Sequence, residues 1–106
     1  MRKNRIDDLE TLKNTVENLT KSTAVYLDKT AVIEKFGLKT AWQGIVYIFK
    51  IRGNPEAEIC YAWSSPKEGS SKRRYYAVLK IPPIDSPEKA VRAAIVRDYK
   101  KKINES

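Results

Sequence analysis

The stretch WQGIVYIFKIR, residues 42–52, decides the fold class of this chain. Apolar side chains recur along it with a period of two, which is the repeat of a β-strand and not of a helix. RGNPEA, residues 52–57, then predicts a turn, because Gly53 tolerates a positive φ and Pro55 fixes its own φ. A strand that runs directly into a turn favours an antiparallel sheet.

Two more runs with the same repeat follow. They are EICYAWS, residues 58–64, and RRYYAVLKI, residues 73–81, joined by the polar loop SSPKEGSSK, residues 64–72. Three strands with short connections predict an antiparallel meander, because a parallel pair needs a longer crossover. The more apolar strand faces should pack against helices. Those faces carry Ile45, Tyr47, Phe49, Ile59, Tyr61, Trp63, Tyr75, Leu79 and Ile81.

Two helices are expected before this sheet. Apolar residues at spacings of three and four predict an amphipathic helix over residues 6–20. We expect a short second helix over residues 28–36, because Asp28 is a suitable cap and Gly37 is a suitable residue to end it.

A further helix is expected after the sheet, where Ser86 is followed by Pro87. The serine hydroxyl can accept a hydrogen bond from a free backbone N–H, and proline suits the first helical position. The predicted architecture is one two-layer α+β domain spanning residues 1–106, with all helices on one face of a three-stranded antiparallel meander. The ends, residues 1–5 and 102–106, are expected to be flexible.

Positive charge is concentrated in the second part of the chain. The net charge is +8, from 21 Lys and Arg against 13 Asp and Glu. Residues 37–106 hold fourteen Lys and Arg against seven Asp and Glu, a net charge of +7. A field of one sign favours anionic partners such as DNA or RNA.

Neither a membrane span nor an export signal is expected. The chain has no run of eighteen apolar residues, and its start, MRKNRIDDLE, lacks the apolar stretch of a signal peptide. We therefore expect a cytoplasmic protein that does not enter a membrane.

Several classes of active site lack their usual residues. Histidine is absent, which removes the side chain that normally titrates near neutral pH and excludes most zinc sites. Cys60 alone cannot hold a metal, and no glycine-rich phosphate-binding motif is present. We therefore expect no enzymatic activity, no cofactor and no metal.

Cations and aromatic residues alternate on the face of the predicted sheet that should remain open. Lys and Arg bind phosphates and aromatic rings stack on bases, so the pattern predicts a noncatalytic nucleic-acid-binding surface. The candidate residues are Trp42, Lys50, Arg52, Lys72, Arg73, Arg74, Tyr76 and Lys80. Cations of the last helix extend this surface if they lie on an accessible side: Lys89, Arg92, Arg97, Lys100, Lys101 and Lys102. Such cations also suit a solvated sheet face or a sheet edge that must resist aggregation.

The order of the last elements resembles known nucleic-acid-binding domains. Three strands followed by a helix that opens with IDSPEKAVRAAI, residues 84–95, are similar to the ethylene-response-factor type of DNA-binding domain and to the arm-binding domains of tyrosine integrases. This resemblance spans residues 42–101 and implies that the open sheet face enters the major groove. Helix, three strands and helix also look like the order in double-stranded RNA-binding domains, although the histidine-containing loop of many such domains is missing here.

The alternative is a small protein-interaction or homodimerising module with no nucleic-acid role. Two heptads of apolar residues in the first helix favour it, at Leu9, Leu12, Val16 and Leu19. The same stripe also suits packing on the chain's own sheet. Ionic strength separates the two functions, because nucleic-acid binding weakens steeply with salt and an apolar dimer does not.

Overall fold

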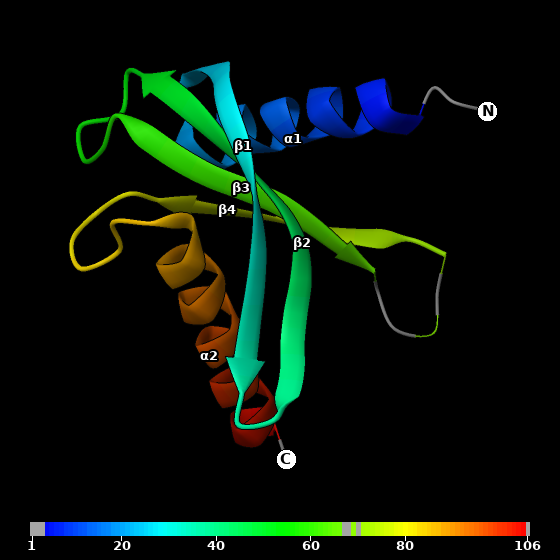
Figure 1. Ribbon diagram of the computed structural model, residues 1–106. Helices are drawn as coiled ribbons and strands as arrows, with labels where there is room; N and C mark the ends of the chain where they lie inside the picture. The colour runs from blue at the N-terminus through cyan, green and yellow to red at the C-terminus, as the bar shows by residue number, and fades with distance from the viewer. Residues whose placement is uncertain (1–3, 67–68, 70, 106) are drawn as a thin grey trace.

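The computed structural model describes residues 4–66, 69 and 71–105, and within these it describes the side chains of residues 9–35, 37–66, 69 and 71–101. The described residues form two helices and four strands (Figure 1). In order they are α1 (Asn4–Thr20), β1 (Thr23–Phe36), β2 (Lys39–Arg52), β3 (Ile59–Pro66), β4 (Arg73–Leu79) and α2 (Pro87–Glu105). No helix in the described part of the chain is long and apolar enough to cross a membrane.

The α+β class and the antiparallel sheet are confirmed, but the sheet has one strand more than predicted. Its order is β1-β2-β3-β4, and all neighbouring strands are antiparallel. The predicted helix over residues 28–36 is wrong, because these residues form most of β1. Gly37, with a φ of 64°, lies in the β1–β2 hairpin turn and does not end a helix.

A β-bulge explains why the strand pattern of β1 is hidden in the sequence. Tyr26 pairs with Phe49 and Asp28 pairs with Ile48, so Leu27 is an extra residue without a partner. An extra residue moves the following side chains to the other face of the sheet. The alternation of apolar residues therefore changes phase inside the strand, and no period of two runs through its whole length.

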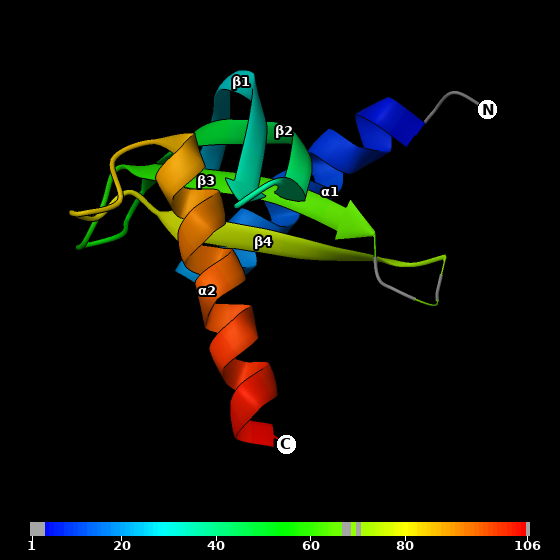
Figure 2. The same ribbon diagram turned by 60° about the horizontal axis from the view of Figure 1, so that its bottom comes forward.

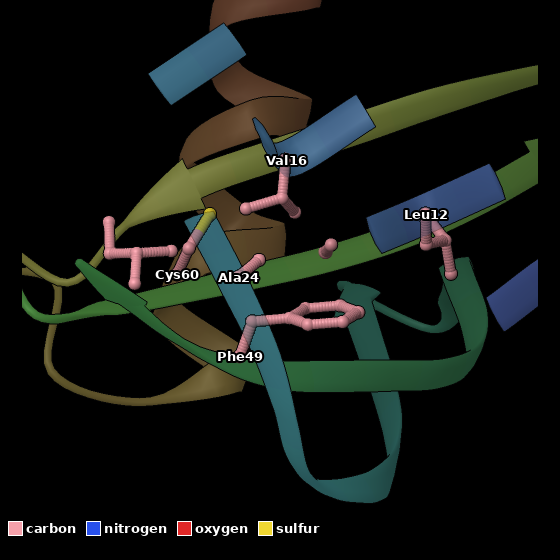
Figure 3. Packing of buried hydrophobic residues seen from close by; sticks show 7 residues of the cluster. Leu12, Val16, Ala24, Phe49 and Cys60 are labelled. Atoms are coloured by element: carbon pink, nitrogen blue, oxygen red, sulfur yellow. The ribbon is translucent and has the colours of Figure 1, made fainter. Parts of the chain in front are cut away.

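The helices lie on opposite faces of the sheet, so the prediction that they share one face is wrong (Figure 2). On the α1 face, side chains of α1, β1, β2 and β3 point toward one another (Figure 3). That buried cluster consists of Leu12, Val16, Ala24, Phe49, Ile51, Cys60 and Ala62. On the α2 face the buried cluster consists of Val32, Val46, Tyr61, Trp63, Ala90, Val91 and Ala94.

The predicted packed face combined residues from both of these clusters. Phe49 pairs with Cys60 and both face α1, whereas Tyr61 and Trp63 face α2. Tyr75 packs on the α1 side with Phe49, as expected, but Trp63 does not. Because both faces of each strand carry apolar residues, the sequence alone does not determine how the faces of successive strands align.

The β1–β2 hairpin extends beyond the rest of the sheet. Among the described residues, the β2–β3 ladder runs from Tyr47 to Lys50, while the pairing of β2 with β1 continues to the hairpin turn. The extended part lies beside α2 (Figure 1), and the Arg92 guanidinium on α2 donates a hydrogen bond to the Glu34 carboxylate on β1 (Nε to Oε1, 2.6 Å).

The predicted start of the last helix is confirmed. The Ser86 hydroxyl accepts a hydrogen bond from the backbone N–H of Lys89 at 3.2 Å, which satisfies one free donor of the first turn. Of the ends expected to be flexible, residues 1–3 and 106 lie outside the described residues, and the others belong to α1 and α2.

Candidate nucleic-acid interface

The candidate residues from the sequence lie at two separate ends of the sheet. Lys50 pairs with Ile59, and the backbone N–H of Lys80 donates to the Ile59 carbonyl at 2.9 Å, so both lie where β3 begins. Arg52 follows on β2 beyond Lys50. At the other end of β3, Arg73 and Arg74 pair with its last residues.

Charges of both signs occupy the end that holds Lys50, Arg52 and Lys80. The backbone carbonyl of Glu58 accepts a hydrogen bond from Ile51, so Glu58 lies next to these cations. The Asp85 carboxylate is bound by the Lys89 ammonium at 3.0 Å. That hydrogen bond lowers the pKa of Asp85, and the charges of Lys89 and Lys80 add to the effect. Carboxylates lie among the cations at this end, which lowers the local positive potential that a polyanion would meet.

Cations converge at the opposite end, between the edge of β4, the end of α1 and α2. Arg74, Arg97 and Lys101 line one concave surface there, with a volume of about 310 Å3. We call this surface the basic cleft. Its other lining residues are Leu19, Tyr75, Tyr76, Ala77 and Asp98, so the lining contains one carboxylate. The cleft therefore carries a net positive charge.

Tyr76 lines the basic cleft, but its ring and its hydroxyl both already have partners within the fold. Its ring stacks on Trp63, with centroids 5.2 Å apart and planes 7° apart, and the Arg74 guanidinium carbon lies 5.7 Å from its centroid. Its hydroxyl donates to Asp98 Oδ2 at 2.9 Å. Burial and this hydrogen bond raise the pKa of Tyr76, so the hydroxyl stays protonated and keeps donating. The expectation that Tyr76 lies on an open sheet face is wrong, because α2 covers it.

Trp42 is half-buried beside Trp63, with ring centroids 6.1 Å apart. Its indole lies directly over Gly44, where an added Cβ would stand 2.7 Å from Trp42 Cζ2. Only glycine leaves room for the ring in this position. Gly44 therefore permits the position that the Trp42 ring takes here.

Arg73 and Lys72 differ from Arg74 in their surroundings. The Arg73 guanidinium donates to the Ser64 hydroxyl at 2.9 Å and to the Ser64 carbonyl at 3.3 Å. It alternates with Arg74 along β4 and therefore points to the other face. Lys72 is exposed immediately before the strand.

The cations of α2 were predicted from the sequence only as a conditional extension of the sheet face. Arg97 and Lys101 are four residues apart, a spacing that places both on the same side of a helix. That spacing was the available signal, but the packing of α2 beside Arg74 depends on the tertiary fold. Lys102 also belongs to α2, although its side chain is not among those described.

The apolar stripe considered for a homodimer packs mainly inside the chain. Leu12 and Val16 belong to the buried cluster on the α1 face, and Leu9 is half-buried against it. Leu19 is 63% exposed and lines the basic cleft. The folded chain therefore buries the middle of this stripe and leaves mainly Leu19 exposed.

The residues that most often carry catalysis or metals add little here. Among the residues that the structure describes, no group of three or more His, Cys, Asp or Glu is placed to hold a metal ion. Burial raises the pKa of the Cys60 thiol to about 12, so Cys60 stays protonated at neutral pH. It is a packing residue of the α1-side cluster.

No protein family, curated protein or solved structure matches this chain. The geometry implied by its resemblance to sheet-in-groove DNA-binding domains also does not fit, because α2 packs on the sheet face that would enter the groove. Function is therefore inferred from the chain's own surfaces.

Proposed function

We propose that this chain binds nucleic acid without catalysis, through the basic cleft. The observation that carries this proposal is the convergence of Arg74, Arg97 and Lys101 on one concave surface. Asp98, the carboxylate in the lining, already accepts a hydrogen bond from Tyr76. Arg74 belongs both to the surface predicted from the sequence and to the cleft, which lies between β4 and α2 and not on an open sheet face.

Three cations on one concave surface suit a phosphate backbone. Each phosphate that a Lys or Arg neutralises releases condensed counterions, which favours binding at low salt. Arg97 also lines a second hollow along α2 together with Arg92 and Lys100, so positive charge continues along the helix. The net charge of +8 adds long-range attraction to a polyanion.

The test is fluorescence anisotropy with labelled single-stranded and duplex DNA and RNA at several NaCl concentrations. The double variant Arg74→Ala/Arg97→Ala should bind more weakly, and its salt slope should fall by about one for each phosphate that it no longer neutralises. The matched control is Lys50→Ala/Lys80→Ala, which removes the same charge from the mixed end of the sheet. We expect this control to bind nearly as well as the wild-type chain.

Two outcomes would contradict the proposal. Equal weakening in both double variants would mean that net charge matters and the cleft does not. Absence of binding to every probe at low salt would refute a nucleic-acid-binding function altogether. Circular dichroism of each variant separates loss of binding from loss of fold.

A second candidate function, binding of an acidic protein segment, is favoured by the hollow along α2. This hollow has a volume of about 610 Å3 and combines apolar side chains with cations. Its lining consists of Pro83, Ile84, Lys89, Arg92, Ala93, Val96, Arg97 and Lys100. An acidic segment with apolar residues would complement both features, and this function replaces the first if no nucleic acid binds.

A further inference from the structure

A small pocket lined by aromatic rings lies between the sheet and α2, next to the basic cleft. Its volume is about 210 Å3. Three rings contribute to its wall, those of Trp42, Trp63 and Tyr76. The remaining lining consists of Ala41, Ser65, Val91, Ala94, Ile95 and Asp98. We call it the aromatic pocket; its rings and aliphatic side chains stand beside the polar groups of Ser65, Tyr76 and Asp98, a mixture that can hold and orient a small flat ring.

The aromatic pocket and the basic cleft are adjacent. Tyr76 and Asp98 line both of them. Arg74 lies over the Tyr76 ring on the cleft side. A ligand with an anionic part in the cleft can therefore reach the pocket with a neighbouring group. A nucleotide has this form, because its phosphate is charged and its base is a flat ring.

The size of the pocket favours a single ring. An apolar cavity of about 150 Å3 is sufficient for benzene. At about 210 Å3, the aromatic pocket has room for one six-membered ring with its substituents, which favours a pyrimidine over the larger purine. Half-buried Trp42 offers an indole surface for stacking, which is how proteins commonly hold bases of single strands.

The Asp98 carboxylate favours cytosine over uracil and thymine. Tyr76 donates to its Oδ2, and a carboxylate has further acceptor positions. The exocyclic amine of cytosine is a donor that carboxylates accept from in proteins. In uracil and thymine the ring N–H lies between two carbonyl oxygens. These oxygens carry partial negative charge and would be repelled by the Asp98 carboxylate.

We propose that the aromatic pocket binds one pyrimidine base of a single strand, with cytosine preferred, while the adjoining phosphates lie in the basic cleft. This inference rests on the proposed nucleic-acid binding. Trp42 stacks on the base, Asp98 accepts a hydrogen bond from it, and Tyr76 positions the Asp98 carboxylate. Because a base inside a duplex is not free to enter a pocket, single strands bind more tightly than duplexes.

The experiment compares four labelled single strands of equal length: oligo-dC, oligo-dT, oligo-dA and an abasic strand with the same phosphates. Wild-type chain should bind oligo-dC roughly tenfold more tightly than the abasic strand, the scale expected for stacking of a base on an aromatic side chain. Oligo-dC should also bind more tightly than oligo-dT and oligo-dA. Tryptophan fluorescence should be quenched by oligo-dC and not by the abasic strand.

Two variants sharpen the test. Asp98→Asn removes a negative charge, so binding of the abasic strand should become tighter or stay the same, whereas the preference for oligo-dC should fall. Trp42→Leu leaves all charges in place and should reduce oligo-dC binding toward that of the abasic strand. A general change in charge or stability would alter binding of both probes by similar factors and would not lower the preference for oligo-dC.

The outcomes separate this inference from the function on which it rests. If all four strands bind equally and binding still depends on Arg74 and Arg97, the base pocket is refuted and the basic cleft stands. If no strand binds, both are refuted. A preference for oligo-dA would also refute the pocket, because its volume was the reason for choosing a single ring.

Discussion

At the scale of single residues, the ion pair between Glu34 and Arg92 joins α2 to the β1–β2 hairpin. The Glu34 side chain is 6% exposed and the Arg92 side chain is 57% exposed. Loss of the pair therefore costs more on the Glu34 side, because a buried carboxylate without a partner is destabilising, whereas an exposed guanidinium is solvated by water. The hydrogen bond from Arg92 to Glu34 and the attraction between their charges raise the pKa of Arg92.

The burial of Glu34 predicts different effects for two substitutions in α2. Arg92→Ala leaves the buried Glu34 carboxylate without its donor and should lower the melting temperature measurably. Lys89→Ala breaks an ion pair in which both side chains are at least half exposed and should leave the melting temperature nearly unchanged. Thermal unfolding followed by circular dichroism measures both variants. An equal loss in the two variants would mean that Glu34 is accessible to water in solution.

At the scale of elements, β1 offers a direct test of the corrected secondary structure. Val32 is 1% exposed and Ile33 is 54% exposed, as expected for neighbours on opposite faces of a strand. Val32→Asp should destabilise the chain by about 3 kcal/mol or more, because it places an unpaired charge inside the α2-side cluster. Ile33→Asp is the matched control and should cost little. Urea unfolding measures both, and similar losses would contradict the burial of Val32 and the exposure of Ile33 that β1 gives them.

The same element shows what the sequence could and could not predict. The first helix was predictable because its apolar spacing stays regular, with Leu12 and Val16 both on the packed side. β1 was not, because the bulge at Leu27 interrupts its period of two, and Asp28 and Gly37 also fit a short helix. Secondary structure was thus predictable wherever one regular period runs through the whole element.

The sequence indicated which residue types the candidate interface contains, but not where on the fold they lie. Arg74 was identified from its alternation with aromatic residues, and it does lie in the basic cleft. Its neighbours Arg97 and Lys101 come from a helix more than twenty residues later, so only the docking of α2 brings them together. Lys50 and Lys80 share the same strand pattern as Arg74, yet they lie at the other end of the sheet.

At the scale of the whole molecule, the net charge of +8 acts on stability and on binding in opposite directions. Like charges on a folded chain repel one another, so the compact state is disfavoured at low ionic strength. Salt screens this repulsion, with a screening length of about 10 Å at 0.1 M. The same screening and the loss of counterion release weaken binding to a polyanion.

Raising NaCl from about 0.02 to 0.3 M should therefore increase the melting temperature by about a few degrees. For a domain of this size, a change of about 1 kcal/mol in the free energy of unfolding shifts the melting temperature by roughly 4–8 °C. Over the same range, affinity for a single strand should fall steeply. Arg74→Ala/Arg97→Ala lowers the net charge from +8 to +6, so both responses should be smaller in this variant. A melting temperature that falls with salt would show that attractive ion pairs, such as Glu34 with Arg92, outweigh the repulsion among the excess cations. In that case attractive ion pairs would govern the salt response of stability, while the salt slope of binding would still report on the cations of the basic cleft.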